Sequence, residues 1–431
     1  MRNSIVRSAV LAAGLAGGML GVAAGSGSAV ADTVSLFCSS SGSEYELCKN
    51  AAEAWAKESG NQVKINKMPA SWDDALPLYQ QLLAAQSSDI DVMLIDVVWV
   101  GMLQKNLLDL NGLIPADEIK AQFPSAVAAG SVDGRLVAMP WYNDTGLLFY
   151  RKDLLEKYNK PVPKTYEELA ATAKEIQDGE RKAGNGDMWG YVWQGKAYEG
   201  LTCDAIEWVA SYGGGTIIDD KGNVTIDNPK AAAALTEAAS WVNTISPQGV
   251  LGYDEESSRG TFEAGNAVFL RNWSYVWGTS QTAGGKLVGK VGVTALPVGA
   301  EGERSSGCAG TAHIGVSKYT KHKEAAVGLV RYLTGQAEQK RRVIEATYNP
   351  TVASLYSDPD VLKAVPFLQD VIKGFDESVA RPSSVTGSSY NKVSQAFYTE
   401  VHAVLAGEKK SDAALKELAD ELAKIKKRSG W

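Results

Sequence analysis

Histidine and cysteine are scarce in this sequence of 431 residues, which contains three His and four Cys. The histidines (His313, His322 and His402) have no spacing typical of metal ligands, and no Cys-x-x-Cys pair occurs. We therefore expect neither a bound metal ion nor another cofactor. Metal ligation by the cysteines stays open as the alternative to disulfide formation.

Basic runs and common catalytic motifs are also absent. The net charge is -7 with no cluster of Lys and Arg, which argues against nucleic acid or an anionic membrane as a partner. The sequence has no phosphate-binding Gly-x-x-x-x-Gly-Lys-Ser/Thr loop, no Gly-x-Ser-x-Gly elbow and no His-Glu-x-x-His pair. These absences remove the signatures of three enzyme classes, but not of an enzyme that needs only two carboxylates.

The one long apolar stretch lies at the N-terminus. Arg2 and Arg7 precede an apolar segment, residues 8–22, and Ala29-Val30-Ala31 has the A-x-A pattern of a cleavage site. We expect residues 1–31 to be a signal peptide and the mature chain to be soluble and periplasmic or secreted. A membrane anchor is the alternative, but the stretch is short for a hydrocarbon core of about 30 Å.

An exported chain with four cysteines suggests disulfides. Cys38 and Cys48 are close in sequence, and their pairing is our first choice among the three connectivities. That choice leaves Cys203 to pair with Cys308, although nothing local brings these two positions together.

The chain that remains after cleavage, about 400 residues, is longer than one hydrophobic core usually organises, so two lobes are expected. Apolar patterns predict strand, helix, strand, helix, strand over residues 33–95, which indicates an α/β fold with a parallel sheet. Further along, Asp133-Gly134 predicts a tight turn. Thr165 with Glu168 predicts a helix capping box, and Asn228-Pro229 predicts a helix start.

Two segments place a carboxylate beside aromatic residues at predicted strand ends. Asp96 is followed by Trp99, and Asp144 is preceded by Tyr142. Ligands of open α/β sheets bind beyond the carboxyl ends of strands. A carboxylate there can accept hydrogen bonds from sugar hydroxyls, and an indole or phenol can pack on the C–H face of the sugar. The alternative is that both Asp residues cap helices or turns and that the aromatic residues are core.

Two further segments add candidates. Trp273 and Trp277 are four residues apart, so they would share one face of a helix, either as a binding surface or as core. Arg381 precedes a proline and could direct two donors at oxygen atoms. An enzyme is the alternative to a binding protein, because Asp96 and Asp144 could also flank a glycosidic bond in a secreted glycoside hydrolase. A structural or adhesin-like surface protein is a third possibility.

Several ordered segments resemble the family 1 extracellular solute-binding proteins of ABC transporters, and most of all their trehalose/maltose-binding subgroup found in rhizobia. The resemblance covers essentially the whole mature chain. It is carried by LYQQLLAAQSSDIDVMLIDVVWVG (78–101), MPWYNDTGLLFYRKDLLEKY (139–158), WGYVWQGKAYEGLTC (189–203), Glu255–Trp277 and VGVTALPVG (291–299).

The resemblance implies a periplasmic-binding-protein type II fold, with two α/β lobes joined by a hinge and a ligand cleft between them. By analogy, residues 32–142 and 291–334 would form the N-lobe, and residues 143–290 and 335–431 the C-lobe. The implied protein is not an enzyme. It delivers an oligosaccharide, such as trehalose or maltose, to the membrane subunits of an ABC importer. We expect a monomer, because no part of the sequence indicates a subunit interface.

The resemblance also assigns ligand-binding roles and reveals one departure. The implied ligand-binding residues are Glu44 (with Glu46 as the less favoured choice), Asp96, Trp99, Tyr142, Asp144, Trp273, Tyr275, Trp277 and Arg381. The subgroup usually has a Gly-Gly-Trp stretch where this sequence reads Gly310-Thr311-Ala312, without a Trp. The loss of this stacking wall leaves a different disaccharide or a glycosylated polyol open as the ligand.

Overall fold

The computed structural model describes residues 31–40, 42–69, 72–299, 302–369 and 378–431. Asp32–Trp431 form one compact unit, which contains two main sheets with separate hydrophobic cores, as expected for two lobes. The predicted signal peptide lies, apart from Ala31, outside the described residues. Within these ranges, no helix is both long enough and apolar enough to cross a membrane.

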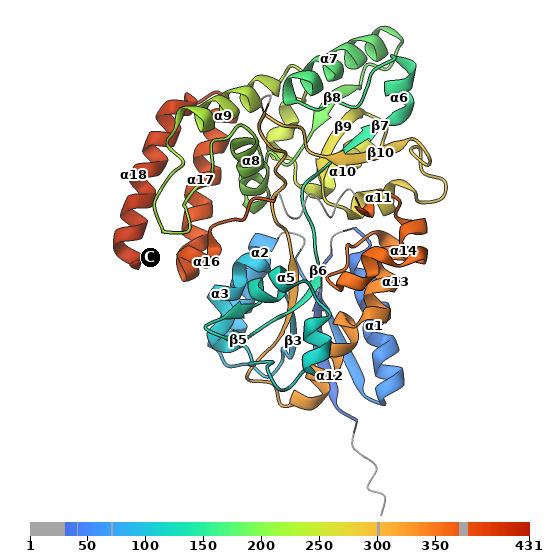
Figure 1. Cartoon of the computed structure of the whole chain (residues 1–431), viewed down its shortest axis with the longest axis vertical. Helices are drawn as coiled ribbons and strands as arrows, with labels where there is room; N and C mark the ends of the chain where they lie inside the picture. The colour runs from blue at the N-terminus through green and yellow to red at the C-terminus, as the bar shows by residue number, and fades with distance from the viewer. Residues whose placement is uncertain (1–30, 41, 70–71, 300–301, 370–377) are drawn as a thin grey trace, which may run out of the picture. The chain divides into compact units, whose positions relative to one another are not determined.

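The first lobe is built on a five-stranded sheet with the strand order β2-β1-β3-β11-β6 (Figure 1). Its strands are β1 (Thr33–Cys38), β2 (Gln62–Lys67), β3 (Val92–Asp96), β6 (Met139–Tyr142) and β11 (Ala312–Val316). The parallel pairing of β1 with β2 and β3 confirms the prediction from the strand–helix spacing. β11 runs antiparallel to β3 and β6, so β6 points in the same direction as β3.

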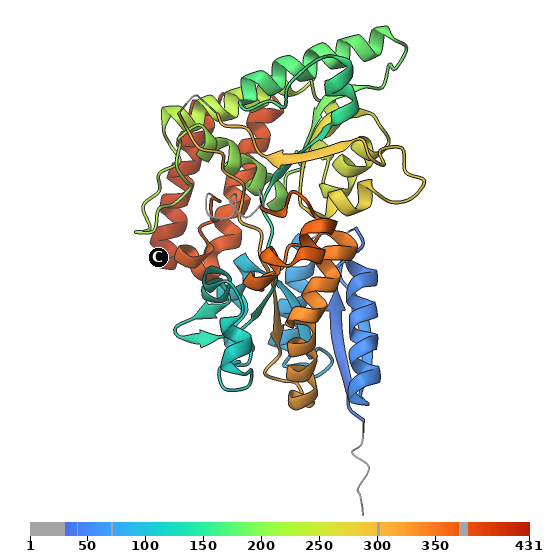
Figure 2. The ribbon, with the colours of Figure 1, turned by 45° about the vertical axis from the view of Figure 1, so that its right-hand side comes forward.

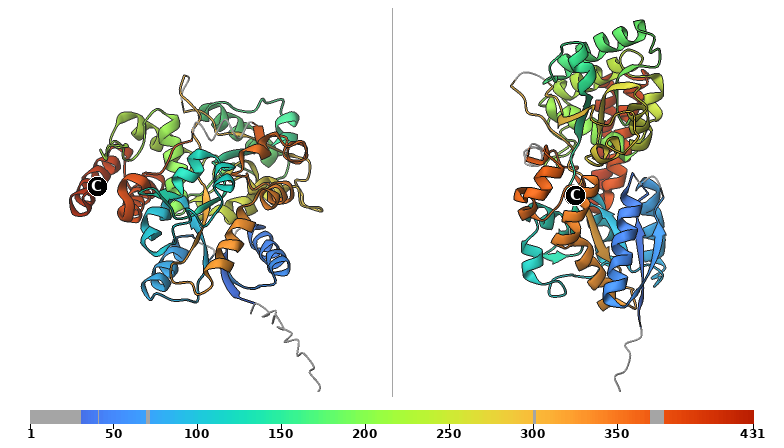
Figure 3. Two further views of the ribbon diagram at one scale, coloured as in Figure 1. Left: turned by 60° about the horizontal axis from the view of Figure 1, so that its bottom comes forward. Right: turned by 90° about the vertical axis from the view of Figure 1, so that its right-hand side faces the viewer.

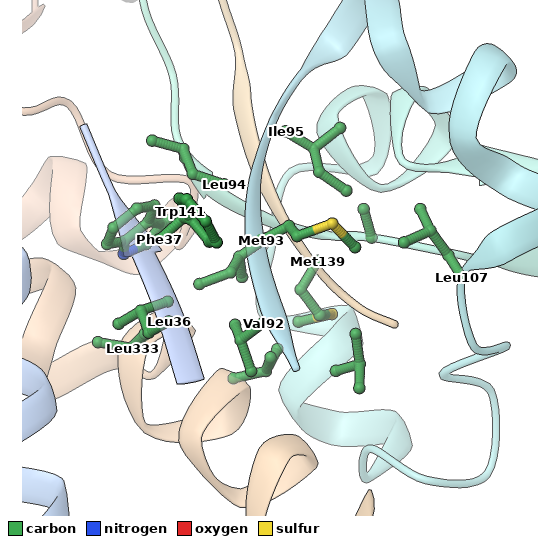
Figure 4. Close-up of a cluster of buried hydrophobic side chains, with 14 of the residues drawn as sticks. Leu36, Phe37, Val92, Met93, Leu94, Ile95, Leu107, Met139, Trp141 and Leu333 are labelled. Atoms are coloured by element: carbon green, nitrogen blue, oxygen red, sulfur yellow. The ribbon is translucent and has the colours of Figure 1, made fainter. Parts of the chain in front are cut away.

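Helices cover both faces of this sheet because its strands are apolar on both sides. Leu94 and Ile95 point to opposite sides of β3 (Figure 4) and are both fully buried. The helix α1 packs against α12 (Figure 2). The helices of this lobe are α1 (Glu44–Ser59), α2 (Trp72–Ala84), η1 (Val97–Trp99), α3 (Val100–Leu103), η2 (Gln104–Asn106), α4 (Ala116–Lys120), α5 (Pro124–Ala129) and α12 (Lys323–Thr334).

The second lobe is built on a four-stranded sheet with the order β10-β7-β9-β8. Its strands are β7 (Leu147–Arg151), β8 (Trp189–Val192), β9 (Ala267–Asn272) and β10 (Val291–Ala295). The last two helices of the chain lie side by side (Figure 3). The helices of this lobe are α6 (Lys152–Lys157), α7 (Tyr166–Lys182), α8 (Glu199–Ser211), α9 (Pro229–Trp241), η3 (Gln248–Gly252), α10 (Glu255–Glu263), α11 (Tyr275–Ser280), α17 (Tyr390–Leu405) and α18 (Ser411–Ser429).

The local sequence signals give the predicted structures. Asp133 and Gly134 both have positive φ in the turn between β4 (Ser131–Val132) and β5 (Arg135–Leu136). At the start of α7, the Thr165 hydroxyl accepts from the Glu168 amide at 3.1 Å, and both arms of the capping box are present. These turns and caps are confirmed because each depends on residues only a few positions apart.

The prediction that Trp273 and Trp277 share a helix face is wrong. β9 continues to Asn272, which pairs with Leu147 of β7, so no helix can begin before that residue. Trp273 lies in the turn after β9, and only Trp277 is in α11. Strand pairing with a distant segment therefore overrides the local spacing.

Several segments cross between the lobes and bond to one another. Residues 143–146 connect β6 to β7, and isolated bridges join Thr145 to Ala309 and Asn143 to Asn349. A further bridge joins Cys308 to Val379. The lobes are thus connected by neighbouring segments that are far apart in sequence, as a hinge requires.

The predicted lobe boundaries need correction at two places. β10 was assigned to the N-lobe, but it pairs along its length with β7 of the second sheet. We therefore propose that the chain returns to the first lobe between Ala295 and Ala312. α13 (Gln336–Ala346) was assigned to the C-lobe, but it packs on α12, and the Gln339 side chain donates to the Thr334 carbonyl and Thr351. We place it, with η4 (Ala353–Ser357) and α14 (Pro359–Ala364), beside the first lobe.

The cysteines follow the prediction in one pair only. Cys38 and Cys48 form a disulfide with a Cα–Cα distance of 5.9 Å. Cys203 and Cys308 are buried free thiols, so the predicted second disulfide is not present. The two thiols do belong to one core cluster, and a hydrogen bond with Cys308, together with burial, raises the pKa of Cys203.

Candidate functional site

A cavity lies between the two lobes at the carboxyl ends of β1, β3 and β6. It encloses about 960 Å³ of space between atoms, including solvent at its mouth. Seven of the nine predicted ligand-binding residues line it: Glu44, Asp96, Tyr142, Asp144, Trp273, Tyr275 and Arg381. The structure thus brings together residues that are up to 337 positions apart in the sequence.

Arg381 joins carboxylates of the two lobes at one end of the cavity. Its guanidinium donates to Asp96 of the first lobe at 3.1 Å and to Glu199 of the second at 2.8 Å. Asp96 also accepts from the Val98 amide at 3.0 Å, so it is both a helix cap and a cavity residue. Burial raises the pKa of Glu199, although Arg381 opposes that rise. The remaining lone pairs of these carboxylates can accept hydrogen bonds from ligand hydroxyls.

Asp144 is held in the first crossing segment by donors from the second lobe. Its carboxylate accepts from the Thr145 amide at 2.9 Å, the Ser274 amide at 3.2 Å and the Ser274 hydroxyl at 3.1 Å. Burial raises the pKa of Asp144 to about 7 despite these hydrogen bonds. A carboxyl group with this pKa is about half protonated near pH 7.

Glu44 approaches the cavity from the first turn of α1. One of its carboxylate oxygens accepts from Arg342 at 2.8 Å, and both side chains are about 1% exposed. The other oxygen, Oε2, is buried and has no hydrogen-bond partner among the described residues. A buried acceptor without a partner is costly, so a ligand hydroxyl at this oxygen would be favourable.

Aromatic rings line the cavity beside Glu44. Tyr348 packs edge-on against Tyr142 at 5.1 Å and is stacked against Tyr275 at 6.4 Å. The guanidinium of Arg271 lies 4.2 Å from the centre of the Trp273 ring. A Cβ atom added to Gly310 would lie 2.8 Å from that ring, so only glycine allows the crossing segment to pass this close to Trp273.

Two predicted ligand-binding residues do not line the cavity. Trp99 is only 4% exposed and packs against Trp72 and Tyr79 in the first core. Trp277 lies on α11 and packs against Phe367 at 5.0 Å. Both were expected from the resemblance, but the turn of the helix that carries each one directs the ring elsewhere.

Other lining residues were not predicted. Among them are Trp72, Tyr198, Glu199, Glu255, Thr311 and Tyr348. Tyr198 and Glu199 fall within the quoted segment 189–203, where an aromatic–acid pair before a helix was a usable signal. Trp72 starts α2, five residues after the end of β2, and is followed by Asp73, so the same aromatic–acid pattern was present there.

Histidines play no part in this cavity. His313 is buried and bonds the Ala126 carbonyl, and His402 bonds the Leu251 carbonyl. Among the described residues, no group of three or more His, Cys, Asp or Glu side chains could hold a metal ion. The cavity offers hydrogen-bond acceptors, one guanidinium and flat aromatic surfaces, which together suit an uncharged polyhydroxylated ring.

Comparisons with known proteins agree with this geometry. A profile described as bacterial extracellular solute-binding protein matches residues 40–340, more than half of the chain. The chain belongs to this family. A probable ABC transporter-binding protein of Deinococcus radiodurans is 49% identical over 401 residues, covering 93% of this chain and 94% of that protein.

One solved structure and a further sequence relative are similar to most of this chain. The maltose-bound MalE3 of T. maritima superimposes with a TM-score of 0.87 at 36% identity, covering 92% of this chain and 100% of that one. A galactooligosaccharide-binding protein of Bacillus subtilis is 25% identical over 325 residues, covering 73% of this chain and 72% of that protein. The predicted two-lobe α/β fold is thus confirmed.

Proposed function

We propose that this chain is the substrate-binding component of an ABC sugar importer. In this role, it would bind a small oligosaccharide between its lobes. The observation that carries the proposal is the convergence of carboxylates and aromatic rings from both lobes on one cavity. Carboxylates accept hydrogen bonds from pairs of hydroxyls, and aromatic faces cover the apolar side of a sugar ring.

The relatives support this class of ligand. The T. maritima relative is bound to maltose and the B. subtilis relative is a galactooligosaccharide-binding protein, while the D. radiodurans relative is a probable ABC transporter-binding protein. We place α-linked glucose disaccharides first, maltose or trehalose, as in the trehalose/maltose-binding subgroup. Ala312, where the subgroup has a Trp, keeps another disaccharide or a glycosylated polyol as the second choice.

The mechanism is capture without chemistry. Open lobes would expose Asp96 on one side and Trp273 on the other, and a ligand that contacts both lobes would favour the closed state. Each hydroxyl-to-carboxylate hydrogen bond in this setting contributes about 1.5–3 kcal/mol. The closed, monomeric protein would then dock on separate membrane subunits, after export by the signal peptide to the periplasm.

The glycoside hydrolase alternative has no support from the site. Asp96 is bound by Arg381, and Asp144 is bonded by two amides and a hydroxyl, so both carboxyls already have partners within the protein. The family matched by the sequence is one of solute-binding proteins. We therefore propose no catalytic residue for this chain.

Changing either wall of the cavity should weaken sugar binding. We expect Asp96→Ala and Trp273→Ala each to raise the Kd at least about tenfold, or about 1.4 kcal/mol, because each removes a contact from one lobe. A thermal-shift screen of a sugar panel would identify the ligand, and calorimetry with that sugar would measure the change. Unchanged affinity in both variants would contradict the site.

Trp277→Ala is the matched control, since this indole is half-buried like Trp273 but packs on Phe367 outside the cavity. Its Kd should stay at the wild-type value. Release of reducing sugar from α-glucosides by the purified protein would instead support the hydrolase, and the absence of a thermal shift with every sugar would refute sugar binding altogether.

A further inference from the structure

One wall of the cavity has no large side chain. The crossing segment that reaches it contributes Gly310, Thr311 and Ala312. Gly310 lies against the edge of the Trp273 ring, and Ala312 is paired with both Asp96 and Tyr142 in the sheet. A second sugar ring that binds beyond Trp273 therefore needs an aromatic surface from another element.

Trp72 offers such a surface. It is the first residue of α2, it is half-buried, and it lines the cavity. Its ring centre lies 5.4 Å from that of Trp99, at an interplanar angle of 48°. Trp99 in turn packs edge-on against Tyr79, which is fully buried. This support fixes the indole before any ligand binds, which lowers the entropic cost of stacking.

The neighbouring residue ties this position to the other lobe. The Asp73 carboxylate accepts from the amide of Glu199, the first residue of α8, at 3.2 Å. The Glu199 side chain is bound by Arg381, which also binds Asp96. Trp72 therefore stands next to the group of charged side chains that can bond ligand hydroxyls.

A second aromatic group lines the cavity beside Glu44. Tyr348 joins Tyr142 and Tyr275 there, and Glu44 contributes its unpaired oxygen. Among the described residues, no ring contact connects this group to Trp72. The cavity thus has two aromatic regions, each with its own carboxylates. This arrangement suits a ligand that contains two sugar rings.

We propose that Trp72 is the stacking surface for the second ring of the ligand, in place of a side chain that the segment Gly310–Ala312 lacks. This inference rests on the proposed sugar-binding function. The first ring lies by Trp273 and Glu44, and the second lies between Trp72 and the carboxylates of Asp96 and Glu199. Trp72 would then select for disaccharides over monosaccharides.

Calorimetry with maltose and with glucose tests the assignment. Trp72→Ala should raise the Kd for maltose at least about tenfold, because the apolar contact area of one ring is lost, and should leave the Kd for glucose within about threefold. Trp72→Phe keeps a flat ring and should retain most of the affinity. Trp277→Ala, which removes an equally half-buried indole outside the cavity, should change neither value.

The outcomes separate this inference from the proposed function. Wild-type protein that binds no sugar of the panel would overturn the proposed function and the inference together; if the panel identifies a disaccharide other than maltose, that disaccharide and its monosaccharide are the pair compared. Wild-type protein that binds maltose, with a Trp72→Ala variant of equal affinity, would overturn the role of Trp72 alone. An equal loss for maltose and glucose would also overturn it, because the residue would then not be specific to the second ring.

A spectroscopic readout guards against a purely structural effect of the alanine variant. The protein can be labelled with 5-fluorotryptophan, and the fluorine resonance that disappears in Trp72→Phe is that of Trp72. Maltose should shift this resonance more than glucose does, while the resonance that disappears in Trp277→Phe should stay in place. A Trp72 resonance that maltose leaves unmoved would contradict the proposal.

Discussion

Replacing Arg271 by leucine should lower the free energy of unfolding by about 3–5 kcal/mol. Arg271 is fully buried and ion-paired with Glu207, and its Nε lies 3.1 Å from a carboxylate oxygen of Asp204. Both acids are also fully buried. The substitution would leave two carboxylates in the core without their counterion, and urea denaturation at neutral pH would measure the loss.

Two further variants test the cause of that loss. Arg331→Leu breaks a pair with Glu118 in which the side chains are 44% and 36% exposed, so it should cost less than about 1 kcal/mol. The triple variant Asp204→Asn, Glu207→Gln, Arg271→Met removes the whole charged group and should regain part of the stability. A triple variant less stable than Arg271→Leu would contradict this account.

Asp144 should make the stability of the protein fall as the pH rises from about 5 to 8. Burial raises its pKa from 3.8 to about 7, so between these values the folded state holds a proton that the unfolded state has released. The stabilising contribution is complete below pH 4 and is lost as the pH passes 7. By linkage, the loss between pH 5 and 8 is on the order of 2–3 kcal/mol.

The Asp144→Asn variant isolates this effect from all other titrating groups. We expect the free energy of unfolding of the variant, minus that of the wild type, to increase by that amount between pH 5 and 8. Urea denaturation at several pH values would measure both. The asparagine oxygen can still accept from the Ser274 amide, so the local structure has a substitute acceptor. Parallel pH profiles of the two proteins would show that Asp144 ionises normally in the fold.

Features that depend on short stretches of sequence were predictable. The capping box at Thr165 and the turn at Asp133 need only neighbouring residues. The parallel pairing of β1 with β3 followed from the spacing of apolar runs. Asp96 and Asp144 were found because ligands bind beyond the ends of strands, and the resemblance to a family added distant residues such as Arg381.

Features that depend on pairing between distant segments were not predictable. β10 belongs to the second lobe because it pairs with β7, and nothing in its own apolar pattern specifies that partner. Trp277 and Trp99 were expected at the site, but the Trp99 ring lies in the first core and the half-buried Trp277 ring packs on Phe367, outside the cavity. Trp72 was missed for the converse reason, since its position depends on the contact of its ring with Trp99, which is 27 residues away in the sequence.

The close approach of Gly310 to Trp273 has a consequence for redesign. The Gly310 amide donates to the Asp144 carbonyl at 2.9 Å, so the glycine is anchored in its segment, and a Cβ atom added to it would lie 2.8 Å from the indole. The three atoms nearest to a methyl group at this position would all belong to the Trp273 ring, so we expect the substitution to displace this ring. Residue 310 is therefore a place at which ligand preference could be retuned, for instance in a fluorescent sugar sensor, with the polar contacts left intact.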